Sequence, residues 1–119
     1  MADKFDDFVN AVTEGAKDLA KDIFDGFEEQ ATEDAKAFAK KAEADLRRWV
    51  KLLEDGEITK QDFGDLVQGK EALAEIHALT VAGISLTKLE RFRSGLMDLV
   101  VDTAFKILDR KSTRLNSSH

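Results

Sequence analysis

Acidic residues surround a glycine near the middle of the chain, in an order that partly matches a calcium-binding loop. Asp55 and Gly56 match the fifth and sixth positions of an EF-hand loop, and Asp62 matches the twelfth. In this register the first and third positions fall on Lys51 and Leu53, which provide no carboxylate. The front half of the loop therefore lacks its ligands, and calcium binding is not expected.

The second candidate for metal chemistry is His77, which has Glu71 and Glu75 nearby in the sequence. A di-iron helical bundle needs a Glu-x-x-His motif twice and two further glutamates. The residue three positions before His77 is Ala74, and the other histidine, His119, is the last residue of the chain. The sequence therefore predicts no metal site, and we expect His77 to be a partly buried interface residue.

The remaining residues form no pattern that would support catalysis. Without a second internal histidine, a glycine-rich phosphate loop or a nucleophile elbow, there is no arrangement for acyl or phosphoryl transfer. Cysteine is absent, which excludes disulfides and thiolate metal sites. We therefore expect a non-enzymatic protein with no catalytic residues and no cofactor.

The acidic stretch is better explained as a turn between two helices. Gly56, which follows Asp55, can adopt the left-handed conformation that ends a helix. Thr59 is followed three residues later by Asp62, which approximates a capping box with Asp in place of Glu or Gln. The sequence thus predicts that one helix ends and another begins around a turn at residues 55–58.

The residues around this turn resemble a SHOCT-type hairpin, a short helical module. The module has three spaced apolar residues, then Gly-x-Ile-Thr, then an acid followed by Phe. The matching residues here are Leu46, Trp49, Leu52, Gly56, Ile58, Thr59, Asp62 and Phe63. The resemblance covers residues 46–70, and it departs from the family at Val67, where the module has lysine, and in its central place in the chain. It implies an interaction or oligomerisation hairpin with no chemistry of its own.

Amphipathic helical patterns flank the turn on both sides. Apolar residues recur with a mean spacing of about 3.7 residues in the first arm, which predicts a nearly straight helix. No proline interrupts either arm. The predicted fold is all-α, a long antiparallel hairpin with arms at about residues 3–54 and 59–109 in a single domain of residues 1–110. Gly26 and Gly83 are the weakest points, and breaks there would give a four-helix arrangement.

The second arm is apolar on more than one side. Residues 96–108 are apolar over roughly 200° of the helical wheel, whereas a surface helix usually has an apolar stripe of a little more than 100°. One neighbouring helix cannot cover that surface, so the arm either lies inside a bundle made by a folded-back first arm or pairs with a second copy. The predicted self-association interface comprises Leu73, Ile76, Leu79, Leu86, Leu89, Phe92, Leu96, Met97, Val100, Val101, Phe105 and Leu108.

The net charge of −6 arises in the first half of the chain. Residues 1–60 hold 10 Lys and Arg against 16 Asp and Glu, and residues 61–119 hold 8 of each, which makes nucleic acid an unexpected partner. The longest uncharged run, residues 76–87, is shorter than the roughly twenty residues of a transmembrane helix. The acidic N-terminus lacks a signal-peptide pattern, and with the absence of cysteine this predicts a cytoplasmic location.

Two functions fit these patterns. The first is a non-enzymatic interaction or structural module that forms a homo-oligomer through the second arm, with room for another protein partner. The second is reversible binding to a lipid or hydrophobic granule surface, since residues 36–51 carry six basic residues beside the apolar stripe of the first arm. Residues 3–34 are strongly acidic, which opposes binding to anionic lipid.

The last nine residues depart from the helical pattern. Residues 111–119 resemble translated sequencing-adapter read-through, so we expect a non-native or disordered tail there. The native sequence would then differ beyond Arg110.

Overall fold

Six α-helices follow one another along the part of the chain that the computed structural model describes, which is the backbone of residues 4–116 and the side chains of residues 5–107. The helices are α1 (Lys4–Phe24), α2 (Glu28–Lys41), α3 (Glu43–Glu54), α4 (Lys60–Gln68), α5 (His77–Val81) and α6 (Leu86–Asn116). A 3-10 turn, η1 (Glu71–Leu73), lies between α4 and α5. Residues 4–116 contain no strand, so the predicted all-α class is confirmed.

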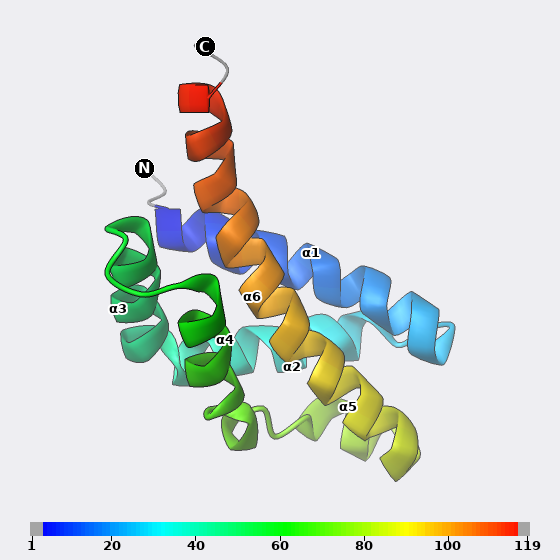
Figure 1. The fold of residues 1–119 in the computed structure, drawn as a ribbon. Helices are drawn as coiled ribbons and strands as arrows, with labels where there is room; N and C mark the ends of the chain where they lie inside the picture. Colours follow the sequence, from blue (N-terminus) through cyan, green and yellow to red (C-terminus); the bar gives the residue numbers. More distant parts are fainter. Residues whose placement is uncertain (1–3, 117–119) are drawn as a thin grey trace.

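The long helices α1 and α6 cross near the middle of the molecule (Figure 1). α1 packs against both α2 and α6, while α4 packs against α6 and α3. The short helix α5 lies against α2. The result is a compact globule in which α6 has neighbours from both the first and the second half of the chain.

The predicted turn at residues 55–58 is confirmed. Gly56 has a φ of 77°, which ends α3 in the left-handed region. The Thr59 hydroxyl accepts a hydrogen bond from the Asp62 N–H at 3.0 Å, and the Asp62 carboxylate accepts one from the Thr59 N–H at 3.0 Å. Thr59 and Asp62 thus form a complete capping box at the start of α4.

The predicted continuous arm over residues 3–54 is wrong, because α1, α2 and α3 share this region; residues 1–3 lie outside the described part. α1 ends at Phe24 because the next three residues leave the helical region, with φ values of 56° at Asp25, 154° at Gly26 and 63° at Phe27. The alternative prediction of a break near Gly26 is confirmed. Figure 1 shows that the chain reverses here, so that α2 runs back along α1.

A second change of direction, at Ala42, was not predicted. Ala42 has φ −97° and ψ 10°, outside the usual helical values. Its N–H still bonds to the Phe38 carbonyl at 2.9 Å, and its own carbonyl accepts from the Leu46 N–H at 2.8 Å. The boundary between α2 and α3 is therefore a kink with hydrogen bonds on both sides rather than a loop.

The predicted continuous arm over residues 59–109 is also wrong. Gly83 has a φ of 87° and follows the end of α5, so the predicted break at this residue is confirmed. A further interruption between α4 and α5 was not predicted. There the chain passes through η1 and through Ile76, whose φ is 54°. The Ala74 carbonyl accepts a hydrogen bond from Arg93 Nε of α6 at 3.0 Å, which ties this connection to a distant helix.

A buried carboxylate on α2 determines where α5 begins. Asp34, which is 5 % exposed, accepts hydrogen bonds from the Ala78 N–H at 2.9 Å and from the Leu79 N–H at 3.0 Å. The N-cap residue of α5 is Ile76, whose side chain has no acceptor. The first N–H groups of a helix need acceptors and favour a negative charge, so Asp34 caps α5 from another helix.

The crossing of α1 and α6 depends on two glycines that face leucines of the opposite helix. A Cβ at Gly15 of α1 would lie 2.4 Å from Leu99 Cδ1, and a Cβ at Gly95 of α6 would lie 2.9 Å from Leu19 Cδ2. Each leucine therefore occupies the space that a side chain would need. The packing role of these two glycines was not predicted from the sequence.

The broad apolar surface of α6 is covered within the same chain. Leu96 and Met97 have no exposed area, and Phe92 packs its ring 5.6 Å from the ring of Phe24 at the end of α1. On the side facing α4, Phe63 and Val67 are also fully buried. Two neighbours, α1 and α4, thus cover what a single helix could not.

The backbone of α6 continues to Asn116, into the segment for which the sequence predicts a non-native or disordered tail. Residues 111–116 are helical, and residues 117–119 lie outside the described part. The resemblance of residues 111–119 to adapter read-through stays a prediction.

Candidate functional site

Most side chains of the predicted self-association interface lie inside the single chain. The buried ones are Ile76, Leu79, Leu89, Phe92, Leu96, Met97 and Val100; Leu73, Val101 and Phe105 are half-buried. Leu86 is 71 % exposed, and the side chain of Leu108 lies outside the described part. The buried members could meet a second copy only after a rearrangement, so the interface stays a prediction.

The residues that suggested metal chemistry have other roles. Asp62 serves the capping box, and Asp55 is the C-cap of α3. His77 is exposed at the start of α5 in the single chain, so its burial in an interface stays a prediction. Across the described side chains, no three His, Cys, Asp or Glu residues form a group that could hold a metal ion.

Two ion pairs attach the connection between α4 and α5 to the first half of the chain. Lys70 Nζ lies 2.9 Å from Asp45 Oδ2 on α3, and Lys41 of α2 bonds to Glu75. The hydrogen bond from Lys70 lowers the pKa of Asp45, and the hydrogen bond from Lys41 lowers the pKa of Glu75. Both carboxylates therefore have a structural role.

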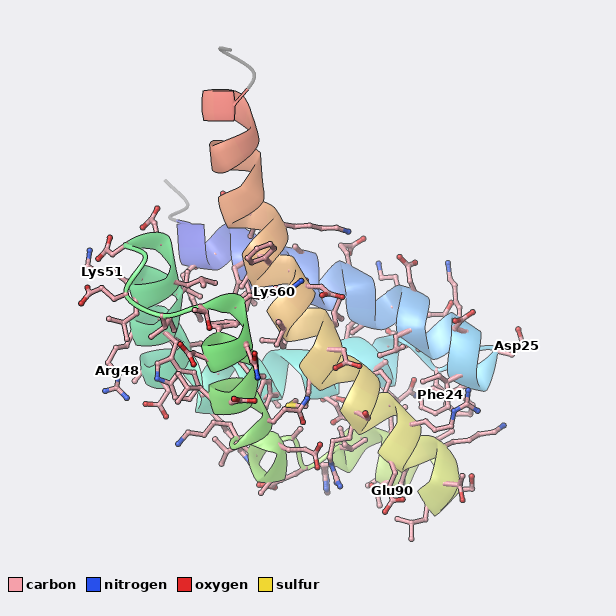
Figure 2. All side chains as sticks on the ribbon, in the orientation of Figure 1. Phe24, Asp25, Arg48, Lys51, Lys60 and Glu90 are labelled. Carbon is pink, nitrogen blue, oxygen red and sulfur yellow. The ribbon has the colours of Figure 1, made fainter. Side chains whose placement is uncertain are left out.

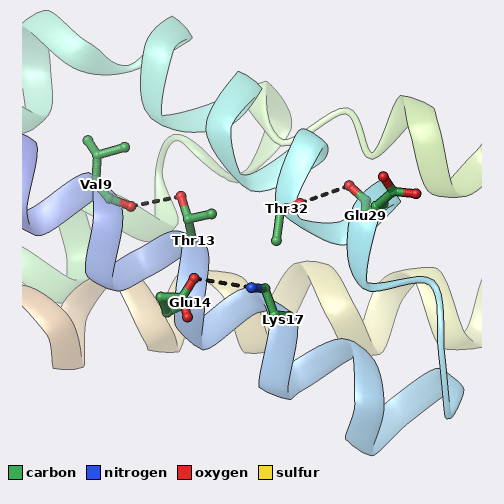
Figure 3. Close-up of polar contacts among 6 residues, drawn as sticks. All are labelled: Val9, Thr13, Glu14, Lys17, Glu29 and Thr32. Atoms are coloured by element: carbon green, nitrogen blue, oxygen red, sulfur yellow. Dashed lines mark hydrogen bonds and ion pairs between the residues drawn. The ribbon is translucent and has the colours of Figure 1, made fainter.

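The polar contacts drawn in Figure 3 on the outer faces of α1 and α2 are local. Figure 3 shows Lys17 of α1 pairing with Glu14 at 3.3 Å, and the Thr32 hydroxyl of α2 donating to the Glu29 carbonyl at 2.9 Å. Such exposed contacts within a turn contribute only a few tenths of a kcal/mol each. They do not join helices and do not form a site.

The strongest candidate for a site is a groove of about 670 Å³ between α4 and α6, which we call the α4–α6 groove. Residues spaced four apart line it, because such residues share one face of a helix. They are Lys60, Gln61, Gly64, Asp65 and Gln68 from α4, with Asp98, Val101 and Asp102 from α6. Pockets of this size are typical of ligand and peptide sites.

Gly64 leaves space at the floor of the α4–α6 groove. It lies within α4, where glycine is less favourable than alanine by about 1 kcal/mol. A Cβ at this position would lie 3.9 Å from Val101 Cγ2, an ordinary van der Waals contact. The fold therefore does not require glycine here, in contrast to Gly15 and Gly95. A residue that is unfavourable for its helix and that packing does not require, such as Gly64, is expected at a functional site.

Three carboxylates surround this floor. Asp65, Asp98 and Asp102 are exposed, and among the described side chains none of them has an ion-pair or hydrogen-bond partner. Asp98 and Asp102 are four residues apart on α6, an arrangement of like charges that destabilises a helix slightly. The groove thus combines an apolar floor with unpaired negative charge at its edges.

Lys60, the one basic residue among the described side chains that line the α4–α6 groove, has an aromatic neighbour. Lys60 Nζ lies 4.5 Å from the centroid of the Phe105 ring, and Figure 2 shows Lys60 between the start of α4 and α6. This cation–π contact holds the ammonium group against α6. Lys60 makes no ion pair with the three aspartates, and with its one positive charge against their three negative ones the described lining residues carry a net charge of −2.

Sequence reasoning did not identify this groove. The available signals were a glycine inside a nine-residue helix and two aspartates four positions apart in the largely apolar stretch of residues 96–108. Neither signal indicates that the two helices lie side by side. Val101 was predicted as an interface residue, and among the members of that set whose side chains are described it alone lines the α4–α6 groove.

Comparison with known proteins identifies no relative: no family model, no curated protein and no solved structure matches this chain. No helix in the described part is long and apolar enough to cross a membrane.

Proposed function

We propose that this protein is a non-enzymatic helical interaction module that binds a positively charged helical segment of a partner protein in the α4–α6 groove. The observation that carries the proposal is a glycine floor that the fold does not need, surrounded by three unpaired carboxylates. A helix laid between two helices is a common mode of peptide recognition. Basic residues on such a segment would complement the aspartates at the edges.

The apolar floor determines which side chain of the partner segment can occupy the centre of the α4–α6 groove. Val101 is half-buried and Gly64 has no side chain, so one small or medium apolar side chain fits between them. Lysines or arginines on either side of this residue would approach Asp65 from α4 and Asp98 and Asp102 from α6. Complementary charge of this kind mainly raises the association rate and sets specificity.

Self-association through the second half of the chain has less support. Most of the apolar side chains predicted to form the dimer interface are already buried within the chain. Few described apolar side chains in this half stay largely exposed; they include Val81 at 73 % and Leu86 at 71 %. A stable interface buries roughly 800 Å² per partner. A symmetric dimer through the α4–α6 groove would also place the aspartates of two copies opposite each other, which is unfavourable.

The proposal is tested with a fluorescently labelled synthetic peptide of leucine, alanine and lysine that forms an amphipathic helix, measured by fluorescence anisotropy. The groove variant is Asp65→Asn/Asp98→Asn/Asp102→Asn. The matched control is Asp7→Asn/Asp18→Asn/Asp22→Asn, which removes the same charge from exposed positions on α1. We expect the groove variant to weaken binding by a factor of roughly 3 to 150, since three charge pairs are lost and each contributes roughly 0.2–1 kcal/mol.

Equal weakening by both triple variants would refute the proposal, because it would indicate attraction to net charge rather than to the groove. Gly64→Leu gives an independent test, since it fills the floor without changing the charge. Peptide binding unaffected by Gly64→Leu would also contradict the proposed site. Light scattering on the same samples reports the oligomeric state, and a dimer that competes with the peptide would favour self-association.

A further inference from the structure

A second cleft, of about 450 Å³, lies where α1, α2 and α3 meet, and we call it the three-helix cleft. It shares no lining residue with the α4–α6 groove. Its floor is apolar: Phe5 and Val9 come from the first turns of α1, and Ala39 comes from α2. Phe5 and Ala39 are 8 % and 4 % exposed, so the cleft reaches the edge of the core.

The charged residues around this cleft are unevenly paired. Arg47 Nε lies 2.9 Å from Glu43 Oε2, and the Arg47 guanidinium lies 4.4 Å from the centroid of the Phe5 ring. Asp6, the other acid at the cleft, also has an interaction partner. Both acids at the rim are therefore already engaged.

Two lysines at the rim have no such partner. Lys36 and Lys40 are exposed and four residues apart on α2, and among the described side chains neither has an ion-pair or hydrogen-bond partner. Like charges at this spacing destabilise a helix by a few tenths of a kcal/mol. Their placement beside an apolar floor is complementary to a ligand that has an apolar body and a negative group.

We infer that the three-helix cleft binds a small organic anion, with an apolar body against Phe5, Val9 and Ala39 and a negatively charged group between Lys36 and Lys40. The size of the cleft suits one small molecule. The ligand chemistry is that of an aromatic or aliphatic carboxylate. The inference is independent of the α4–α6 groove and of the proposed partner segment.

A free molecule is favoured over the same chemistry in a membrane. The wall of the cleft opposite the lysines belongs to α1, whose exposed acids include Asp6, Asp7, Glu14 and Asp18. An anionic bilayer brought against Lys36 and Lys40 would approach these acids as well, which is unfavourable. Of these acids only Asp6 lines the cleft, and it already has an interaction partner, so a small molecule in the cleft avoids the other three.

The test uses two ligands of matched shape, 2-naphthoate and the neutral 2-naphthamide, followed by the shifts of backbone amide resonances in NMR spectra of the full chain. We expect saturable shifts with 2-naphthoate concentrated in residues 5–10 and 36–47. Binding of 2-naphthamide should be about 4- to 25-fold weaker, since two charge pairs are lost, each contributing a factor of roughly two to five.

Variants give the second half of the test. Lys36→Gln/Lys40→Gln should weaken 2-naphthoate binding about fivefold or more, whereas the control Lys21→Gln/Lys88→Gln, with the same change in net charge on exposed positions elsewhere, should change it less than about twofold. Ala39→Leu should block both ligands by filling the floor, with circular dichroism used to verify the fold.

Three outcomes would overturn the inference. Equal binding of the two ligands, unaffected by Lys36→Gln/Lys40→Gln, would indicate apolar adsorption alone. Shifts concentrated at α4 and α6 would place the ligand in the other groove. Binding to phosphatidylglycerol vesicles that depends on Lys36 and Lys40, without saturable binding of 2-naphthoate, would assign these lysines to a membrane surface.

Discussion

Alanine at Gly64 should stabilise the protein, whereas alanine at Gly15 should not. Both glycines lie inside helices, so both substitutions gain the same helix propensity, about 1 kcal/mol. At Gly64 the new Cβ would lie 3.9 Å from Val101 Cγ2 and meet no obstacle. The expected increase in the free energy of unfolding is therefore about 1 kcal/mol, or roughly 4 °C in Tm for a domain of this size.

At Gly15 the same methyl group would lie 2.4 Å from Leu99 Cδ1 and 2.9 Å from Leu99 Cδ2, so the leucine must move. Overpacking of this kind costs about 1–3 kcal/mol, which cancels or exceeds the gain in propensity. The contribution of Leu99 can be separated by a double-mutant cycle. In a Leu99→Ala background, Gly15→Ala should become stabilising by about 1 kcal/mol, because the obstacle has been removed.

Urea denaturation followed by tryptophan fluorescence is a suitable assay. Trp49 is the single tryptophan and is 6 % exposed on α3, so its emission reports loss of the core. A Gly15→Ala variant as stable as Gly64→Ala would refute the expected overpacking, because it would show that the Leu99 side chain moves aside at little cost. A Gly64→Ala variant that is destabilised would show that the fold requires this glycine, and would remove the main argument for the α4–α6 groove.

Two further predictions concern carboxylates that join distant parts of the chain. Asp34→Ala should lower the free energy of unfolding by about 2–3 kcal/mol in the same urea assay, because it leaves the Ala78 and Leu79 N–H groups of α5 without acceptors. The control is Glu33→Ala at the exposed neighbouring position, which should change the free energy of unfolding by less than about 0.5 kcal/mol. Equal effects of the two substitutions would contradict the capping role of Asp34. The pKa of Asp45, lowered in the folded state by the hydrogen bond from Lys70, should rise toward its ordinary value in Lys70→Met when measured by carboxyl NMR titration. Because the pKa of Asp45 is lower in the folded than in the unfolded state, any stability from the Asp45–Lys70 pair is present above about pH 4 and is lost as the pH falls through the folded pKa. An unchanged Asp45 pKa in Lys70→Met would contradict this ion pair.

The features that sequence reasoning identified correctly are those set within a few residues. The turn at residues 55–58 was predicted because Gly56, Thr59 and Asp62 contain in their own side chains and backbone everything that a helix stop and a capping box need. The breaks at Gly26 and Gly83 belong to the same class, since glycine alone adopts their φ values at little cost.

The interruption between α4 and α5 could not be predicted in this way. No glycine or proline marks Ile76, and its left-handed conformation accompanies the capping of α5 by Asp34, 44 residues before Ala78. The packing role of Gly15 was hidden for a similar reason, because it depends on Leu99 of a helix far along the chain. Both features become visible only when α2, α5 and the α1–α6 crossing are placed in space.

The amino-acid sequence by itself determined that the chain is helical, where its central turn lies, and that the second half is apolar on several sides. It did not determine what covers that apolar surface, because hydrophobic burial has no direction and is satisfied equally by a second copy or by another part of the same chain. The tertiary structure decided this by folding α1 back along α2 and placing α4 beside α6. The same arrangement brought together the residues of the α4–α6 groove and of the three-helix cleft, which lie on helices that are separate in the sequence.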